Sequence, residues 1–127
     1  MFLLEELPPW HANRSSRLVK TPRLHLGDTG LACALLGADA KTLWADRALL
    51  GQLLETFVFQ ELRRQASWHA DALAFHHFRD RDGYEVDIVI ERGARFACGV
   101  VLYDGTMSLS FGDSLYAVPI RALWEAR

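Results

Sequence analysis

The sequence predicts one α/β domain in which helices flank a mixed sheet of short strands. Three observations carry this prediction. Residues 46–65 repeat apolar side chains at helical spacing, the pattern changes to short β-like runs after Trp68, and Asp82-Gly83 separates two of those runs. With 127 residues, the chain has enough apolar surface for one core but not for two.

The first 27 residues predict a small hairpin-like element. Two short apolar or alternating runs, 2–4 and 23–26, lie on either side of Pro8-Pro9, Asn13 and Ser15-Ser16. Proline, asparagine and serine favour turns and loops, so the two runs read as strands joined by a loop.

Two helices are predicted next. Asp28 or Thr29 can cap a short helix that ends at Gly37. The longer segment, 46–65, repeats large apolar residues at offsets of three and four: Leu50, Leu53, Leu54, Phe57, Val58 and Leu62. Because each such side chain contributes roughly 1.5 to 3 kcal/mol when buried, this helix is expected to organise the core.

The second half predicts strands. The β-like runs are 73–78, 84–91, 99–103, 108–111 and 115–118, divided by turn residues such as Asp82-Gly83 and Asp104-Gly105. An Asp-Gly pair between two strands favours a tight hairpin, so at least part of the sheet should be antiparallel.

Composition excludes several classes of protein. A net charge of −2 argues against a protein that coats nucleic acid or an acidic membrane through its overall field. Cys33 and Cys98 lie far apart, and no apolar run approaches the ~20 residues of a membrane helix. We therefore expect a soluble, cytoplasmic protein with no membrane partner and both cysteines reduced.

Carboxylates gather on the predicted strand 84–91. Simple alternation places Val86, Ile88 and Ile90 on one face, and it places Glu85, Asp87 and Glu91 on the other. Clustered carboxylate oxygens suit Mg²⁺, which activates water and neutralises charge on a phosphate. The alternative is an ordinary sheet with one solvated face.

The long helix adds two carboxylates, Glu55 and Glu61. On a helical wheel Glu61 falls near the middle of the apolar stripe and Glu55 at its edge, so at least one is expected to be partly buried. The alternative is an exposed ion pair with Arg47, Arg63 or Arg64, worth ~0 to 1 kcal/mol.

The order of four motifs resembles a known family. The motifs are Lys20-Thr21-Pro22-Arg23-Leu24-His25-Leu26-Gly27-Asp28-Thr29-Gly30-Leu31, Gly51-Gln52-Leu53-Leu54-Glu55-Thr56-Phe57-Val58, Glu61-Leu62, and Gly83-Tyr84-Glu85-Val86-Asp87-Ile88-Val89-Ile90-Glu91. Together they resemble the C-terminal domain of unknown function attached to prokaryotic AAA-type ATPases. The closing segments 99–105, 117–120 and 123–124 extend the resemblance over nearly the whole chain.

This resemblance implies a restriction-endonuclease-like fold with a PD-(D/E)xK motif, in which Asp87 is the first acid and Glu55 the helix carboxylate. By the same resemblance, a strand with acid-x-Lys and a helical stretch should follow the region of Glu91. Here 91–98 leads straight into 99–102, so that stretch is missing and the sheet is expected to have an unpaired edge.

The missing lysine can be checked without the family. The chain has two lysines, Lys20 and Lys41, and both precede the acidic strand. Arg92 and Arg95 can stabilise anionic charge, but arginine stays protonated and cannot deprotonate water. We therefore expect Glu55 and Asp87 to form a degenerate catalytic site, with Glu55, Asp87 and Glu91 as the candidate ligands if Mg²⁺ binds.

A basic segment precedes the acidic part of the chain. No Asp or Glu occurs in 7–27, while four cations occur there, and the net charge of −2 then leaves −6 on the rest. These candidate phosphate contacts for DNA are Arg14, Arg17, Lys20 and Arg23. The alternative is a solvated basic loop that pairs with the acidic remainder.

Other catalytic motifs fail on inspection. Ala40 stands where a phosphate loop needs the glycine before Lys41, so no ATP binding or ATPase activity is expected. His76 and His77 are neighbours on a strand and point to opposite faces, which makes a shared metal improbable.

Three hypotheses for function remain. The leading one is a catalytically inactive nuclease-like domain that acts by binding, with residues 1–27 as a basic hairpin-like segment that resembles the end of a winged-helix-like unit, and 28–127 as the nuclease-like α/β domain. The second is a Mg²⁺-dependent nuclease that acts on DNA. The third is an interaction domain that recognises an ATPase partner or another copy of itself.

Overall fold

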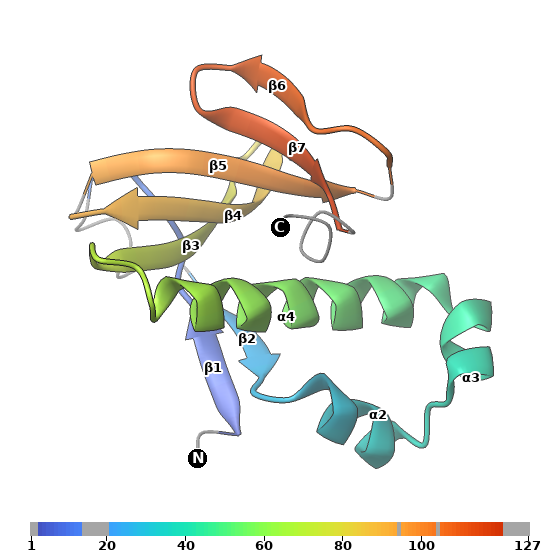
Figure 1. The fold of residues 1–127 in the computed structure, drawn as a ribbon. Helices are drawn as coiled ribbons and strands as arrows, with labels where there is room; N and C mark the ends of the chain where they lie inside the picture. The colour runs from blue at the N-terminus through green and yellow to red at the C-terminus, as the bar shows by residue number, and fades with distance from the viewer. Residues whose placement is uncertain (1–2, 14–20, 94, 104, 121–127) are drawn as a thin grey trace.

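The computed structural model describes residues 3–13, 21–93, 95–103 and 105–120. Within these described residues, three helices lie on one side of a five-stranded mixed sheet, and a two-stranded hairpin lies near the N-terminus (Figure 1). Among the described residues no helix is long and apolar enough to cross a membrane. The prediction of a mixed α/β domain is confirmed, although the described helices cover one face of the sheet and do not flank it.

The predicted N-terminal hairpin is present, with the second strand at 23–26 as predicted and the first at Leu4–Leu7, later in the chain than the predicted run 2–4. β1 (Leu4–Leu7) pairs antiparallel with β2 (Arg23–Leu26), with Leu4 opposite Leu26 and Leu7 opposite Arg23. Leu7 is fully buried. The hairpin is attached to the long helix by the Gln60 side chain, which donates to Glu5 Oε2 at 3.0 Å and to the Leu26 carbonyl at 3.1 Å.

Two short helices follow the hairpin. α2 (Thr29–Leu36) begins at Asp28, whose carboxylate accepts the Leu31 N–H at 2.9 Å, and ends at Gly37, which adopts a left-handed φ of 62°. Both predicted signals are confirmed. α3 (Ala40–Ala45) was not predicted; its N-cap is Asp39, which accepts the Thr42 N–H at 2.7 Å.

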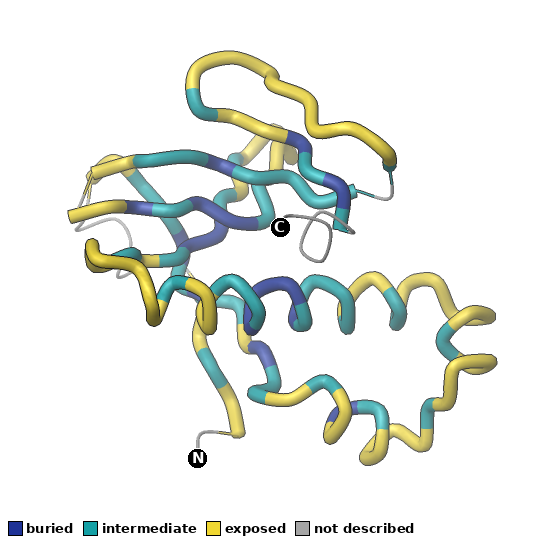
Figure 2. The backbone as a smooth tube through the Cα atoms, in the orientation of Figure 1, coloured by how far each residue is buried: buried dark blue, intermediate teal, exposed yellow. Residues whose placement is uncertain are grey.

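The long helix α4 (Arg47–Ala66) confirms the predicted helix within a residue at each end. Asp46 caps it by accepting the Leu49 N–H at 3.0 Å. The buried positions of α4 gather near its middle, where it faces the sheet (Figure 2). Val58 and Phe59 are at most 2% exposed and form the centre of the core with Ile88, while Val89 is buried on the opposite face of the sheet.

The sheet has the strand order β3-β4-β5-β7-β6. Its strands are β3 (Leu73–Arg79), β4 (Glu85–Arg92), β5 (Arg95–Tyr103), β6 (Leu109–Gly112) and β7 (Leu115–Pro119). The turn between β3 and β4 contains Gly83 at a φ of 88°, and the pair is antiparallel, as the Asp82-Gly83 signal predicts.

β5 pairs with two neighbours. Its first part is antiparallel to β4, and its last part, from Gly99 to Tyr103, is parallel to β7. Parallel neighbours ordinarily need a long crossover. Here β6 comes first in the sequence and lies at the edge of the sheet. The chain then turns back as β7, which lies between β6 and β5 (Figure 1).

The described sheet has an unpaired edge, as expected, but that edge lies at β6 and not beside β5, where the missing stretch was expected. Residues 95–98 and 99–103 form one continuous strand, which pairs with β4 on one side and β7 on the other. The backbone groups that the missing stretch would have paired find partners within the remaining strands. Among the described residues, the open edge is at β6, because β3 makes a parallel bridge from His77 to Pro9.

Candidate functional site

Glu55 and Asp87 come together between α4 and the sheet. They line one pocket of about 230 Å³, together with Gly51 and Leu54 of α4, Leu102 and Tyr103 of β5, and Ile120. Glu55 lies on the side of α4 that faces the sheet, and Asp87 lies near the start of β4. The structure thus places the two predicted acids at one site, and their chemical role stays a prediction.

The carboxylate of Asp87 is held by the backbone. Its Oδ2 accepts the Leu102 N–H at 2.9 Å, just past the end of the β4–β5 ladder at Ile88 and Val100. Burial raises the pKa of Asp87 above 3.8, and the charge of Glu55 raises it further, while the Leu102 N–H and Arg23 act in the opposite direction. Burial dominates because it disfavours the charged form.

Arg23 supplies the cation of this site. From β2 it reaches Glu55 of α4, with Nη1 2.6 Å from Oε1, and it also contacts Glu85 of β4 through Nη2. The side chains of Arg23 and Glu55 are about one quarter exposed. One guanidinium therefore links the hairpin, the long helix and the sheet.

Glu91 lies on the other face of the sheet, so the prediction that it shares a surface with Asp87 is wrong. Between the pairs His76–Val89 and Phe78–Val86, β3 advances two residues while β4 advances three. This β-bulge places Asp87 and Ile88 on the same face, towards α4. Strict alternation, on which the prediction rested, fails at that residue.

Glu91 has partners of its own on the far face. It is 5% exposed, and its Oε1 accepts the Trp10 indole N–H at 2.9 Å. His76 Nδ1 lies 3.9 Å from Glu91 Oε2. The ring of Trp10 also contacts Phe78 and Phe96, so this carboxylate is part of a packed aromatic cluster.

Two buried histidines lie near Arg23. His25 of β2 shares a 2.8 Å hydrogen bond with Thr56 Oγ1 and packs against the ring of Phe59. Burial lowers the pKa of His25 and of His77 below 6.5, and the charge of Arg23 acts in the same direction for both. Both side chains are therefore expected to be neutral at pH 7, which leaves Arg23 as the cation.

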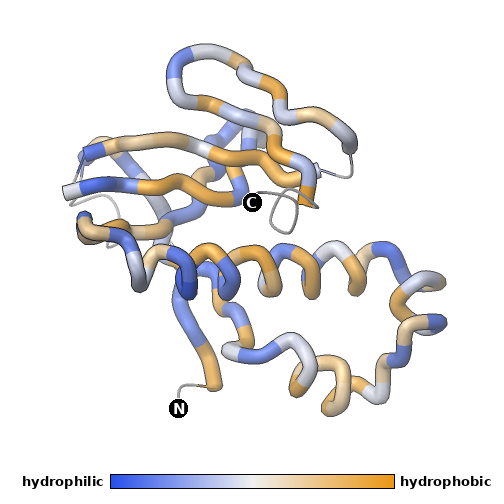
Figure 3. Tube along the Cα trace, viewed as in Figure 1, coloured by the Kyte–Doolittle hydropathy of each residue, from blue (hydrophilic) through white to orange (hydrophobic). Residues whose placement is uncertain are grey.

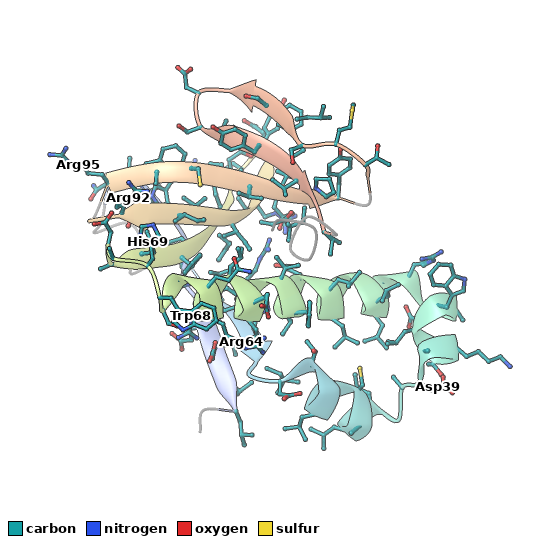
Figure 4. The ribbon with its side chains drawn as sticks, viewed as in Figure 1. Asp39, Arg64, Trp68, His69, Arg92 and Arg95 are labelled. Carbon is teal, nitrogen blue, oxygen red and sulfur yellow. The ribbon has the colours of Figure 1, made fainter. Side chains whose placement is uncertain are left out.

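Arg92 and Arg95, the arginines considered as substitutes for the missing lysine, lie away from Asp87. Arg92 is five residues from Asp87 along β4, which is roughly 16 Å at the spacing of residues in a strand. Its Nε lies 3.5 Å from Asp71 Oδ2. Figure 4 shows Arg92 and Arg95 at the β4–β5 turn. Neither can replace the missing lysine at Asp87.

Metal and DNA ligands were also predicted. Within the described parts of the chain, no group of three or more His, Cys, Asp or Glu side chains is arranged to hold a metal ion. Arg14, Arg17 and Lys20 lie outside the described residues. Arg23, the fourth predicted phosphate contact, is turned towards two carboxylates.

Other sequence predictions have simpler outcomes. Glu61 pairs with Arg64 on the surface of α4, which is the alternative given for it, whereas Glu55 pairs with none of the helix arginines. Cys33 and Cys98 are both free and partly buried. The role of Arg23 was missed, because an arginine in a short strand carries no signal of where its head group goes.

Two family models match different parts of the chain. Residues 50–98 match the domain of unknown function DUF4143, and residues 1–42 match the domain of unknown function DUF8612. The first match covers α4, β3 and β4, and it therefore contains both Glu55 and Asp87. The resemblance of this region to a domain of unknown function is confirmed at that level.

Two curated mycobacterial proteins are also similar. They are the uncharacterized proteins Rv2008c of Mycobacterium tuberculosis and Mb2031c of Mycobacterium bovis, each 28% identical over 93 residues. The match covers 73% of this chain but 20% of each relative, so the chain spans about a fifth of their length. No solved structure matches the chain.

Proposed function

We propose that this chain is a catalytically inactive nuclease-like domain that acts through binding, as a counterpart of the C-terminal part of AAA-type ATPase proteins. One observation carries the proposal. The acidic pair Glu55 and Asp87 shares a pocket, but its cationic partner is Arg23, an arginine from the hairpin.

The chemistry of phosphodiester hydrolysis supports this proposal. A metal-dependent nuclease needs carboxylates free to bind the ion and a group that activates water or stabilises the developing charge. Glu55 is engaged with Arg23, and Asp87 accepts a backbone N–H. Lys41 lies on α3, away from the sheet (Figure 1), and Lys20 precedes β2 in the sequence.

The arrangement of elements supports the proposed relation to restriction-endonuclease-like folds. The helix that carries one acid precedes an antiparallel β3–β4–β5 meander whose middle strand carries the other acid. A strand parallel to β5 follows. The alternative of an active Mg²⁺-dependent nuclease requires Mg²⁺ to displace Arg23, and Glu91 cannot assist from the far face.

Binding to a protein is favoured over binding to DNA by the described surface. α2 carries apolar residues that are exposed (Figures 2 and 3), and α3 exposes Trp44. The exposed fractions of Leu35, Leu36 and Trp44 lie between 60% and 72%. Leu35 and Leu36 are neighbours at the end of α2, and exposed apolar groups that gather on a surface are typical of protein interaction sites. If this chain works within a longer protein, we propose that the partner is another part of that protein.

A cleavage assay tests the inactive assignment. Purified protein is incubated with DNA or RNA and either Mg²⁺ or Mn²⁺, beside an Asp87→Ala control. We expect no cleavage above the control, since losing one charge-stabilising group commonly reduces the rate by ~10²- to 10³-fold.

Cleavage by the parent protein that both Asp87→Ala and Glu55→Ala abolish would overturn the proposal. A matched Glu61→Ala variant changes a carboxylate on the same helix whose partner is Arg64. Cleavage that this variant also loses would point to damaged folding and not to a catalytic role for Glu55.

A further inference from the structure

Arg23 connects three elements at the acidic site. Its guanidinium contacts Glu55 of α4 and Glu85 of β4, and Asp87 lies two residues after Glu85 on the sheet face that β4 turns towards α4. A planar guanidinium offers several donors in a fixed fork, and it matches carboxylate pairs better than a lysine does. The site therefore contains a built-in positive charge.

The position of Arg23 is secured on both sides. His25, two residues on, hydrogen-bonds Thr56 Oγ1 at 2.8 Å, and Gln60 donates to the Leu26 carbonyl at 3.1 Å. Opposite Arg23 on β1, Leu7 is fully buried. The hairpin cannot withdraw Arg23 from the carboxylates without breaking these contacts with α4.

A divalent cation would need the same oxygen atoms. Mg²⁺ and Mn²⁺ bind carboxylate oxygens at short distances, and here the carboxylates near Asp87 are those that face Arg23. Arginine does not lose its proton in proteins, so raising the pH does not release it. A metal ion would have to displace a charge that is covalently part of the chain.

We propose that Arg23 is the internal counter-ion of the acidic site, and that it keeps Glu55, Glu85 and Asp87 closed to divalent cations. This inference rests on the proposed function, since it explains how Glu55 and Asp87 can lie in one pocket of a domain without catalytic activity. In this inference Arg23 blocks the binding of a metal ion and holds Glu55 and Glu85 in place. That role differs from the contact with DNA phosphates that the amino-acid sequence predicts for Arg23.

The test removes the charge and supplies the metal alone. Arg23→Gln keeps much of the side-chain length but has no positive charge, and Arg63→Gln is the matched control, because Arg63 pairs with Glu5 at the other end of the hairpin. Thermal unfolding is measured in EDTA and in a concentration series of MnCl₂. We expect no Mn²⁺-dependent shift for the parent protein or for Arg63→Gln.

For Arg23→Gln we expect a saturable rise in Tm on the order of 5 °C, because an ion that binds the native state stabilises it. Adding Asp87→Asn and Glu55→Gln to Arg23→Gln should abolish that rise. If Arg23→Gln is unfolded in EDTA, Mn²⁺ should restore its circular dichroism spectrum, and failure to do so would contradict the inference.

Two further outcomes would overturn it. One is a saturable Mn²⁺ shift of the parent protein that depends on Glu55 and Asp87, and the other is a folded Arg23→Gln that ignores Mn²⁺. The proposed function fails by a different result, cleavage of nucleic acid by the parent protein. Metal binding by Arg23→Gln without cleavage would support both.

Discussion

At the scale of single residues, the carboxylate of Asp87 decides how the acidic site behaves with pH. Burial holds its pKa above 3.8, although Arg23 is near. A carboxyl group whose pKa is raised in the folded state stabilises the fold below 3.8, and this contribution is lost as the pH rises through the folded pKa. Above its folded pKa, the ionised Asp87 is therefore a cost to stability.

Replacing Asp87 should separate its charge from its hydrogen bond. Asp87→Asn keeps an acceptor for the Leu102 N–H without the charge, so we expect it to be more stable than the parent protein at pH 7, by a margin that shrinks as the pH falls towards 3.8. Asp87→Ala leaves that N–H without its partner and should cost about 1 to 3 kcal/mol. Urea unfolding at pH 7 and pH 5 measures both.

The expected order of stability at pH 7 is Asn, then Asp, then Ala. If Asp87→Asn proves less stable than the parent at pH 7, the attraction of Arg23 outweighs burial. The direction assigned to the Asp87 pKa would then be wrong.

At the scale of elements, α4 carries both the core and the site. Val58 and Phe59 face the sheet, Gln60 and Thr56 hold the hairpin, and Glu55 holds Arg23. These five residues, all within 55–60, thus contact the sheet, the hairpin and the cation of the acidic site. A change that loosens α4 should disturb all three together.

Phe59→Ala tests how much α4 contributes to the core. The ring is 2% exposed and packs against His25, at 5.0 Å between centroids, and Phe75, at 6.3 Å. Truncation of such a ring typically costs about 3 to 5 kcal/mol, a large part of the ~5 to 15 kcal/mol that stabilises a domain. Thermal or urea unfolding should show the loss directly.

Leu35→Ala is the control, since Leu35 is 72% exposed on α2 and should cost less than about 0.5 kcal/mol. Equal costs for the two variants would mean that the core does not centre on Phe59. The hairpin would then have to be stabilised by contacts other than those with α4.

At the scale of the whole molecule, the described sheet has an open edge at β6, and the described helices cover one of its faces. Figure 1 shows the helices on one side of the sheet, and every residue of β6 is exposed. β6 contains no charge and no proline from Leu109 to Gly112, so nothing in the strand discourages pairing with another chain. Phe111 is 64% exposed on this edge.

We expect the protein to self-associate through this edge as its concentration rises. Phe111→Lys places a charge on the open strand and should shift the sedimentation profile towards the monomer. Sedimentation velocity over a concentration series measures the shift. Gln65→Lys adds the same charge at an exposed position of α4 and should leave the profile as in the parent. A parent that stays monomeric throughout would contradict the prediction.

Local patterns predicted most elements because their causes lie within a few residues. Asp28 and Gly37 bound α2, the apolar repeat gives α4, and Asp82-Gly83 gives the β3–β4 turn. α3 was not predicted, because its six residues show no apolar repeat and its one local signal is the N-cap residue Asp39. The pairing of Glu55 with Asp87 came from the resemblance to a family, not from any local pattern.

The sequence by itself thus determined α2, α4, most of the strands and the absence of a lysine after Asp87, because these depend on residues that are close together in the chain. Only the tertiary structure decided which carboxylates meet. A bulge opposite His77 turns Asp87 towards α4 and leaves Glu91 on the far face, and the docking of the hairpin places Arg23 between Glu55 and Glu85. The bulge depends on the register between β3 and β4, because a strand acquires its faces only when it pairs. The position of Arg23 depends on contacts between residues more than 30 positions apart, because a long side chain finds its partners only when the elements pack.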